Sequence, residues 1–405
     1  MALANSRNRR GEPLKTGLVL AGGGARGAYE MGIVLGIVEA LGLKEEDPFP
    51  FPIMCGTSIG SINAGWIAGF ADRGNLDAAE LTRQWVELSL EHYLRLEPAN
   101  LMISALARDE MGSRSLLNPE PFEQFAHAMP WENIQRNIRS GAVQALVFTA
   151  LELDTGRTVW FAQMGEGREF PDWRDNRRTV KPTTLTPDHV LASSAIPIVL
   201  PARRIGDHFY SDGGTRFKTP IAAAIRAGAE RLVVISLRNP DMSPAEMREK
   251  EKREGARGPL APPPLMLMSQ IMGALSFDSC RDDLERIRAI NGLLDTLDDS
   301  LSEEQLATFH DAVTRERGAA WKKIPTLSFE PTLDLGDYAL QKGREVMARH
   351  GWRQRWFLQL LEMKGHGDAL SFLFFDRAFT EELVALGKED ALKRRDEIEA
   401  FFCEE

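Results

Sequence analysis

The amino-acid sequence predicts an α/β fold in which helices cover both faces of a mainly parallel sheet. The apolar run GLVLA at residues 17–21 ends in glycines, and apolar residues at helical spacing follow over Ala28–Leu41. This order is typical of a buried strand that leads into a helix. It recurs at Pro52–Cys55 and Ile59–Phe70, with a Gly/Ser turn between them. Repeated strand–turn–helix units indicate a sheet between layers of helices.

The later elements follow from local composition. Residues 77–140 show helical periodicity with few strand signals, which predicts a helical insertion over the sheet. A hairpin is expected around the turn Asp154-Thr155-Gly156. Apolar and β-branched runs predict strands at Val143–Leu153, Thr158–Phe161, Arg203–Tyr210, Leu232–Leu237 and Ile324–Phe329.

Composition divides the chain into four regions. We expect a flexible N-terminal tail over residues 1–14 and the main core, including the helical insertion, over residues 15–238. A charged and proline-rich stretch at 239–264 (REKEKREGARG, then APPPL) predicts a mobile surface segment. The remainder, residues 265–405, predicts a mostly helical C-terminal region that packs on the core.

Overall composition excludes several classes of protein. The 49 basic and 59 acidic residues give a net charge of −10, which argues against nucleic acid as a partner. Three cysteines form neither a disulfide framework nor a zinc-binding spacing. The first fifteen residues do not resemble a signal peptide, and no apolar stretch reaches the length of a membrane span. We therefore expect a cytoplasmic protein whose contact with membranes is at most peripheral.

A glycine loop follows the first predicted strand. Its members Gly22, Gly23, Gly24, Arg26 and Gly27 lie where a strand leads into a helix. Such a loop leaves backbone N–H groups uncovered beside the positive end of a helix dipole, and it therefore suits an anion. A nucleotide-binding module is an alternative interpretation, but it needs an acidic residue at the end of the next strand, where this chain has Met54-Cys55-Gly56.

A second glycine-framed turn presents a serine. In Gly56-Thr57-Ser58-Ile59-Gly60 the two flanking glycines permit the sharp turn that raises a hydroxyl onto a helix N-terminus. Ser58 is therefore the candidate nucleophile. A serine at its ordinary pKa needs a base to become nucleophilic.

An aspartate turn supplies one candidate base. Asp212, Gly213 and Gly214 follow a predicted strand, and together with the serine they suggest a Ser–Asp dyad. The alternative is a Ser–His–Asp triad of a non-lipid esterase. The seven histidines lie outside glycine-rich turns, at positions 92, 127, 189, 208, 310, 350 and 366.

These motifs together resemble the patatin-like phospholipase family. The resemblance covers roughly Lys15–Ala224 and includes Ala192-Ser193-Ser194-Ala195-Ile196-Pro197, which is similar to that family's A-S-x-A-x-P segment. It implies a three-layer α/β/α fold and a lipid acyl hydrolase that forms a covalent acyl-serine. Ser58 would attack the ester and Asp212 would accept its proton.

The resemblance also implies how the remaining site residues act. Backbone N–H groups of the glycine loop, those of Gly23 and Gly24 above all, would hold the oxyanion with help from Arg26. No cofactor or metal is implied. The implied partner is a phospholipid or another acyl lipid, and nothing in the sequence indicates an oligomeric state. Two aromatic segments, Trp352–Phe357 and Phe372–Phe375, are candidates for membrane contact, although aromatic runs in helical patterns are usually part of a core.

Overall fold

The computed structural model describes residues 14–87, 119–171, 177–197, 199–216, 219–237, 280–317, 321–346 and 367–403. The flexible tail expected at 1–14, except its last residue, and the mobile segment expected at 239–264 lie outside the described residues. So does the aromatic segment Trp352–Phe357. The central part of the helical insertion expected at 77–140 is also outside them; its described portions hold helices α3 (Ala78–Glu87), α6 (Glu120–His127) and α7 (Trp131–Ser140).

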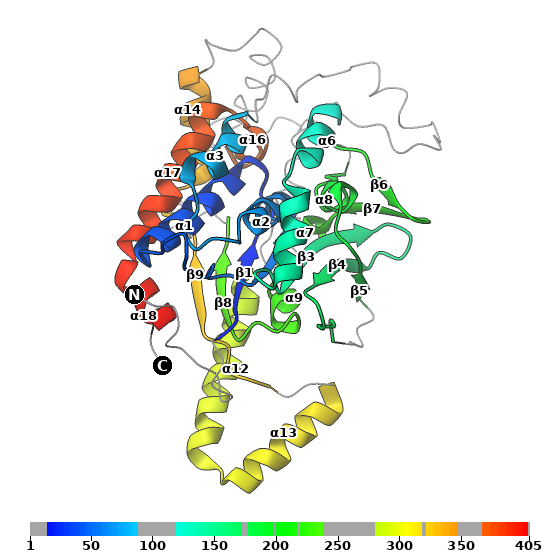
Figure 1. Ribbon diagram of the computed structural model, residues 1–405, viewed down its shortest axis with the longest axis vertical. Coiled ribbons are helices and arrows are strands. Elements are labelled where there is room, and N and C mark those ends of the chain that lie inside the picture. Colours follow the sequence, from blue (N-terminus) through cyan, green and yellow to red (C-terminus); the bar gives the residue numbers. More distant parts are fainter. Residues whose placement is uncertain are drawn as a thin grey trace, which may run out of the picture.

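A nine-stranded sheet forms the centre of the molecule (Figure 1). The order along it is β5-β4-β3-β2-β1-β8-β9, with β7 paired to β3 and β6 paired to β7. Five neighbouring strands from β3 to β9 run parallel, while β4 and β7 each lie antiparallel to β3. The prediction of a mainly parallel sheet is confirmed. The strands are β1 (Thr16–Leu20), β2 (Ile53–Thr57), β3 (Ala145–Glu152), β4 (Thr158–Met164), β5 (Arg178–Pro182), β6 (Arg203–Ile205), β7 (His208–Asp212), β8 (Arg231–Ile235) and β9 (Thr326–Phe329).

One predicted strand was wrong. The run Arg203–Tyr210 was expected to be continuous, but it folds back on itself as the β6–β7 hairpin, in which Arg203 pairs with Tyr210. Gly206, at φ +62°, provides the left-handed residue at the turn, a conformation that glycine adopts without a steric penalty. The hairpin pairs with β3 through β7 alone.

Helices bury both faces of the sheet, so the three-layer α/β/α architecture is confirmed. Alternate residues of each central strand point to opposite sides: Leu18 and Leu20 belong to one apolar core, and Val19 belongs to the other. The first core is covered by α1 (Gly27–Ala40), α2 (Ile59–Gly69) and α17 (Arg377–Lys393). The second is covered by α9 (Ile221–Arg226) and the start of α12 (Cys280–Ser300).

The C-terminal half of the chain takes part in the same fold. Strand β9 extends the sheet beside β8, and α17 lies along α1 (Figure 1). The buried Tyr29 of α1 donates its hydroxyl to Asp390 of α17 at 3.1 Å. Helix α13 (Glu303–Arg317) and the end of α12 project away from this body (Figure 1). The other helices are α8 (Pro187–Ser193), α14 (Leu335–Val346), α16 (Gly367–Leu373) and α18 (Arg395–Cys403).

Helices α1 and α17 approach closely because glycines line their contact. A Cβ atom added at Gly32 would lie 2.1 Å from the backbone oxygen of Val384. The two helices would have to move apart to accommodate it. We expect Gly32→Ala to lower the free energy of unfolding by about 1–3 kcal/mol. Gly292 on α12 is the matched control, because a Cβ there meets nothing within 4 Å and alanine in an exposed helix is favoured by about 0.5–1 kcal/mol. Denaturant unfolding of both variants measures the difference, and equal stability would contradict close packing at Gly32.

Candidate active site

Ser58 occupies a strained turn between β2 and α2. Its backbone has φ 54° and ψ −124°, and it is the one described non-glycine residue with positive φ. Such conformations cost on the order of 1–3 kcal/mol and persist where the surrounding structure enforces them. Added Cβ atoms at Gly56 and Gly60 would lie 2.1 Å from the carbonyl oxygen of Gly60 and 2.5 Å from that of Leu20, respectively. The glycine frame of the elbow is therefore a steric requirement.

Asp212 meets Ser58 at the end of β7. The serine Oγ donates to Asp212 Oδ2 at 2.5 Å, and both residues are buried. The other carboxylate oxygen, Oδ1, accepts the amide N–H of Gly214 at 2.6 Å, which fixes the carboxylate plane. A Cβ at Gly213 would lie 2.4 Å from the carbonyl oxygen of Thr149, so the turn needs glycine there.

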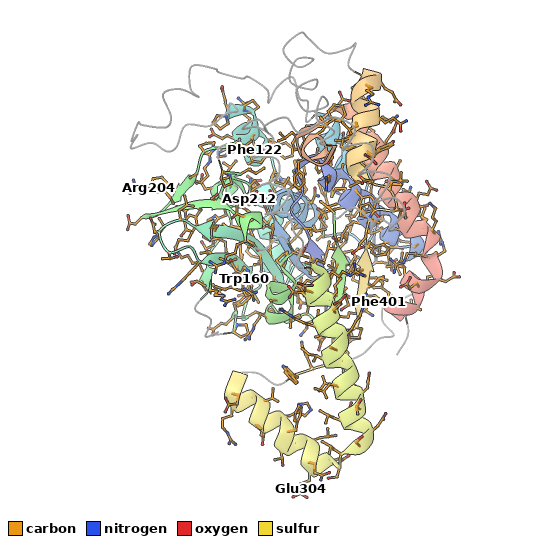
Figure 2. The ribbon with its side chains drawn as sticks, turned by 180° about the vertical axis from the view of Figure 1, so that it is seen from behind. Phe122, Trp160, Arg204, Asp212, Glu304 and Phe401 are labelled. Atoms are coloured by element: carbon orange, nitrogen blue, oxygen red, sulfur yellow. The ribbon has the colours of Figure 1, made fainter. Side chains whose placement is uncertain are left out.

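The sheet explains why two residues so far apart in sequence touch. Thr57, which precedes the serine, pairs with Thr149 on β3, and the next residue of β3, Ala150, pairs with Asp212 on β7. Strand β3 thus pairs with the strand that precedes Ser58 and, at its end, with the strand that carries Asp212. Figure 2 shows Asp212 inside the body of the molecule.

The glycine loop runs past the serine. An added Cβ at Gly22 would lie 3.3 Å from the Cβ of Ser58, and Gly24 adopts the left-handed conformation at φ +59°. Among the described residues, the amide N–H groups of Gly23 and Gly24 have no hydrogen-bond acceptor. The 3₁₀ turn η1 (Gly24–Arg26) and helix α1 follow at once. Uncommitted amides at a helix start beside a nucleophile suit a developing negative charge.

Comparison with known proteins identifies the family. A sequence model described as patatin-like phospholipase matches residues 18–225, just over half of the chain. The chain belongs to the patatin-like phospholipase family. The resemblance that the glycine loop, the serine elbow and the aspartate turn predicted is thereby confirmed. The search of curated proteins found no match to this patatin-like protein.

One solved structure similar to this patatin-like protein is human GIVD cytosolic phospholipase A2 in complex with methyl γ-linolenyl fluorophosphonate. The identity is 12%, over 94% of this chain and 60% of that one, with a TM-score of 0.29. This chain therefore spans about three fifths of that protein's length. A TM-score of 0.29 is too low for a residue-by-residue comparison of the two sites.

Ser193 supports the nucleophile, a role that the sequence did not reveal. It ends α8, accepts the amide N–H of Ser58 at 3.0 Å and donates its own hydroxyl to the carbonyl of Thr149 at 2.7 Å. Ser193 belongs to the A-S-x-A-x-P segment, and that motif was the signal for it. The contact connects the strained turn of this patatin-like protein to β3.

The side chain of Arg26 binds to the C-terminal part of the chain. Its Nε donates to Ser371 Oγ at 2.8 Å, one terminal nitrogen donates to the carbonyl of Leu237 at 3.3 Å, and the guanidinium lies 4.6 Å from the ring centre of Phe372. The guanidinium is thus engaged with α16, which covers the glycine loop: a Cβ at Gly24 would lie 2.1 Å from the carbonyl oxygen of Phe372. A direct role for the Arg26 side chain at the oxyanion stays a prediction, and these contacts do not support it.

Two of the described histidines are engaged away from Ser58. His189 closes a capping box with Thr186 at the start of α8 and packs against Phe161, while His208 pairs with Asp154 at 3.1 Å. Within the described residues the hydroxyl of Ser58 contacts Asp212 and no histidine. His92, His350 and His366 lie outside the described residues.

Neither a metal centre nor a membrane-spanning helix occurs in the part of the chain that the structure describes. The described residues contain no group of three His, Cys, Asp or Glu side chains that could hold a metal ion. None of the described helices combines the length and apolarity needed to cross a bilayer. The absence of a metal or other cofactor from the reaction stays a prediction.

A buried carboxyl group lies directly beneath the glycine loop. Glu30 is fully buried, and Asn63 Nδ2 donates to its Oε2 at 2.8 Å and to the carbonyl of Gly27 at 2.9 Å. Burial raises the pKa of Glu30 well above its usual value, and the donors Asn63 and Ala21 N–H offset this only in part. Glu30 therefore connects α1, α2 and the residue before Gly22, and its burial favours the neutral form.

Glu30→Gln should flatten the pH dependence of stability. The unfolded chain loses this proton above about pH 4.3, whereas the folded chain keeps it, so wild-type stability falls as pH rises, by about 1.4 kcal/mol per pH unit up to the folded pKa. Glutamine keeps the shape and cannot ionise. Denaturant unfolding between about pH 5 and 8 measures the two slopes. The exposed Glu45→Gln serves as control, and parallel curves for wild type and Glu30→Gln would contradict a neutral Glu30.

Proposed function

We propose that this protein is a phospholipase A-like lipid acyl hydrolase that works through a Ser58–Asp212 dyad and a covalent acyl-serine. The family supports lipid acyl hydrolysis in general. The observation that carries the finer proposal is the 2.5 Å hydrogen bond from the hydroxyl of a strained, glycine-framed serine to a buried aspartate.

Acylation begins with Ser58 Oγ. As the oxygen attacks the ester carbonyl carbon, its proton moves along the hydrogen bond to Asp212 Oδ2. The carbonyl oxygen becomes an oxyanion, which the amide N–H groups of Gly23 and Gly24 stabilise; one such donor contributes about 2.7–4 kcal/mol. When the C–O bond to the alcohol breaks, the leaving oxygen takes the proton from Asp212. The products of this half-reaction are the free alcohol and an acyl ester on Ser58.

Deacylation repeats the steps with water. Asp212 accepts a proton from water as the water oxygen attacks the acyl-serine carbonyl, and the same amides stabilise the second oxyanion. The bond to Ser58 Oγ then breaks, the serine regains its proton from Asp212, and the fatty acid leaves. Oδ1 stays bonded to Gly214 N–H throughout, so the carboxylate does not have to reorient.

Covalent trapping tests this proposal. An alkyl fluorophosphonate should add one phosphonyl group to the protein, mapped to Ser58 by peptide mass spectrometry, because its phosphorus mimics the tetrahedral intermediate. Ser58→Ala should remain unlabelled. Ser194→Ala is the matched control and should label at the wild-type rate, because its buried hydroxyl has no hydrogen-bond partner among the described residues.

Phosphatidylcholine vesicles added in parallel should release free fatty acid. Labelling at another residue would contradict the nucleophile. Labelling at Ser58 with cleavage of short soluble esters but no fatty acid from phospholipid would limit the protein to a non-lipid esterase.

A further inference from the structure

The edge of the sheet that carries Ser58 also gathers the ends of other strands. Ser58 follows the carboxyl end of β2, and β3 runs parallel to β2. Because β4 is antiparallel to β3, and β5 is parallel to β4, both of those strands begin at this same edge. The β6–β7 hairpin, attached to the end of β3, lies farther out along it (Figure 1).

This edge has the opposite charge to the chain as a whole. Its described segments 152–158, 177–181 and 203–216 hold seven Arg and Lys residues and four Asp and Glu residues, whereas the whole chain is acidic with a net charge of −10. Four of the arginines are exposed: Arg157, Arg177, Arg204 and Arg216.

The acids at this edge have identified neighbours. Glu152 lies 2.6 Å from Lys181, Asp154 lies 3.1 Å from His208, and Asp207 lies 3.8 Å from Arg204. Asp212 belongs to the dyad. Arg203 contacts Glu123 of α6. Even with Glu123 counted, basic residues outnumber acidic ones here.

An exposed leucine lies among these arginines. Leu153, in the turn between β3 and β4, is 48% exposed, and its amide donates to the carbonyl of Phe209 at 2.9 Å. Among the described residues, the other exposed large apolar side chains are Leu293 at 43% and Leu333 at 46%. The Arg216 guanidinium donates to the carbonyl of Gly156 in the same turn, and Arg216 is four residues from Asp212. Arg216 thus connects the turn that carries Leu153 to the aspartate turn.

We propose that this edge, the cationic rim (Leu153, Arg157, Arg177, Arg204 and Arg216), docks on the surface of an anionic lipid bilayer. Exposed arginines around an apolar side chain match such a surface, because the cations bind the lipid head groups while the leucine enters the apolar boundary. The inference rests on the proposed function, since docking here would bring acyl lipid to the edge that bears Ser58. Because the chain as a whole carries a net charge of −10, an anionic surface is expected to bind it only where basic residues gather.

The aromatic segment Phe372–Phe375 is not available for this role. Phe374 is fully buried, Phe375 stacks on Trp85 with ring centres 6.3 Å apart, and Phe372 lies against Arg26. Phe374 thus belongs to the core, and Leu373 and Phe375 are partly buried against it.

The test measures binding to vesicles of ether-linked lipids, which a hydrolase cannot cleave. Wild-type protein should co-sediment with vesicles of ether-linked phosphatidylcholine and phosphatidylglycerol, and should do so less at high ionic strength or without phosphatidylglycerol. The triple variant Arg157→Gln/Arg177→Gln/Arg204→Gln should bind about a hundredfold more weakly, since each basic residue near the surface contributes about fivefold. Leu153→Ser should weaken binding further.

The matched control removes the same charge elsewhere. Arg286, Arg288 and Arg315 are exposed on α12 and α13. These two helices meet at the corner that Glu304 marks, far from Arg204 in Figure 2. Changing these three to Gln should leave vesicle binding within about twofold. Both triple variants should hydrolyse a soluble ester at the wild-type rate, because neither touches the dyad.

Three outcomes would overturn the proposal: wild-type protein that ignores anionic vesicles at low salt, equal binding to neutral and anionic vesicles, or equal weakening by the two triple variants. None of these depends on turnover. The proposed function fails separately, if Ser58→Ala still hydrolyses the soluble ester.

Discussion

Ser58→Ala is expected to lower kcat/KM for a short-chain soluble ester by about 10⁴-fold or more. The variant removes the oxygen that forms the covalent intermediate, and the described residues that contact it offer no equivalent: the neighbouring Ser193 hydroxyl is already committed to the carbonyl of Thr149. The residual rate would come from the amides of the glycine loop and from substrate binding. Steady-state kinetics on a chromogenic ester measures the loss.

The control for Ser58→Ala is Ser194→Ala, which removes a buried hydroxyl from the A-S-x-A-x-P segment. Its kcat/KM should stay near that of wild type, and both variants should unfold at wild-type denaturant concentrations. Should Ser58→Ala retain more than about a hundredth of the wild-type rate, another nucleophile would have to be sought.

Asp212→Asn should lower kcat/KM by about 10³- to 10⁴-fold. The asparagine oxygen can still accept the Gly214 amide, so the turn keeps its shape, but its amide nitrogen cannot take the serine proton. Asp154→Asn is the control, because it makes the same chemical change away from the site. Asp154 is an exposed turn residue that lies 3.1 Å from His208. Only Asp212→Asn should lose activity.

The histidines decide between the dyad and the triad. A Ser–His–Asp esterase would lose activity as severely with one of the seven histidines replaced by Gln as with Asp212→Asn. The dyad predicts that all seven histidine variants stay within about tenfold of wild type. His92, His350 and His366 belong in this series because the structure does not describe them. One histidine variant as inactive as Asp212→Asn would favour the triad.

The sequence predicted the parts of the molecule that obey local rules. Glycines at fixed spacing around Ser58 and after Asp212 have a local steric cause, so a motif could reveal them. The strands that pair with β2 and β7 could be predicted because their residues form apolar or alternating runs. Strand β5 was missed because Arg178, Lys181 and Pro182 are poor strand signals, which an edge strand tolerates.

The sequence could not reveal contacts between distant parts of the chain. Nothing local to Ser193 indicates that its hydroxyl would hold the amide of Ser58, which lies 135 residues earlier. A glutamate in a helical pattern, such as Glu30, is usually exposed to solvent. Its burial here depends on α2, which places Asn63 within hydrogen-bond distance of it. The Arg26 side chain was expected at the oxyanion, but its contacts lie with Ser371 and Phe372, 345 and 346 residues later in the chain.

The contact between the glycine loop and α16 has a consequence for the order in which the protein is made. The loop, the elbow and the aspartate turn all leave the ribosome before residue 371 has been synthesised. Until then, Arg26 has neither the hydroxyl of Ser371 nor the ring of Phe372 to hold it. A nascent or truncated chain that stops before α16 therefore carries the proposed catalytic residues without these contacts to the glycine loop, and we expect its activity to rise only when the last helices have been translated.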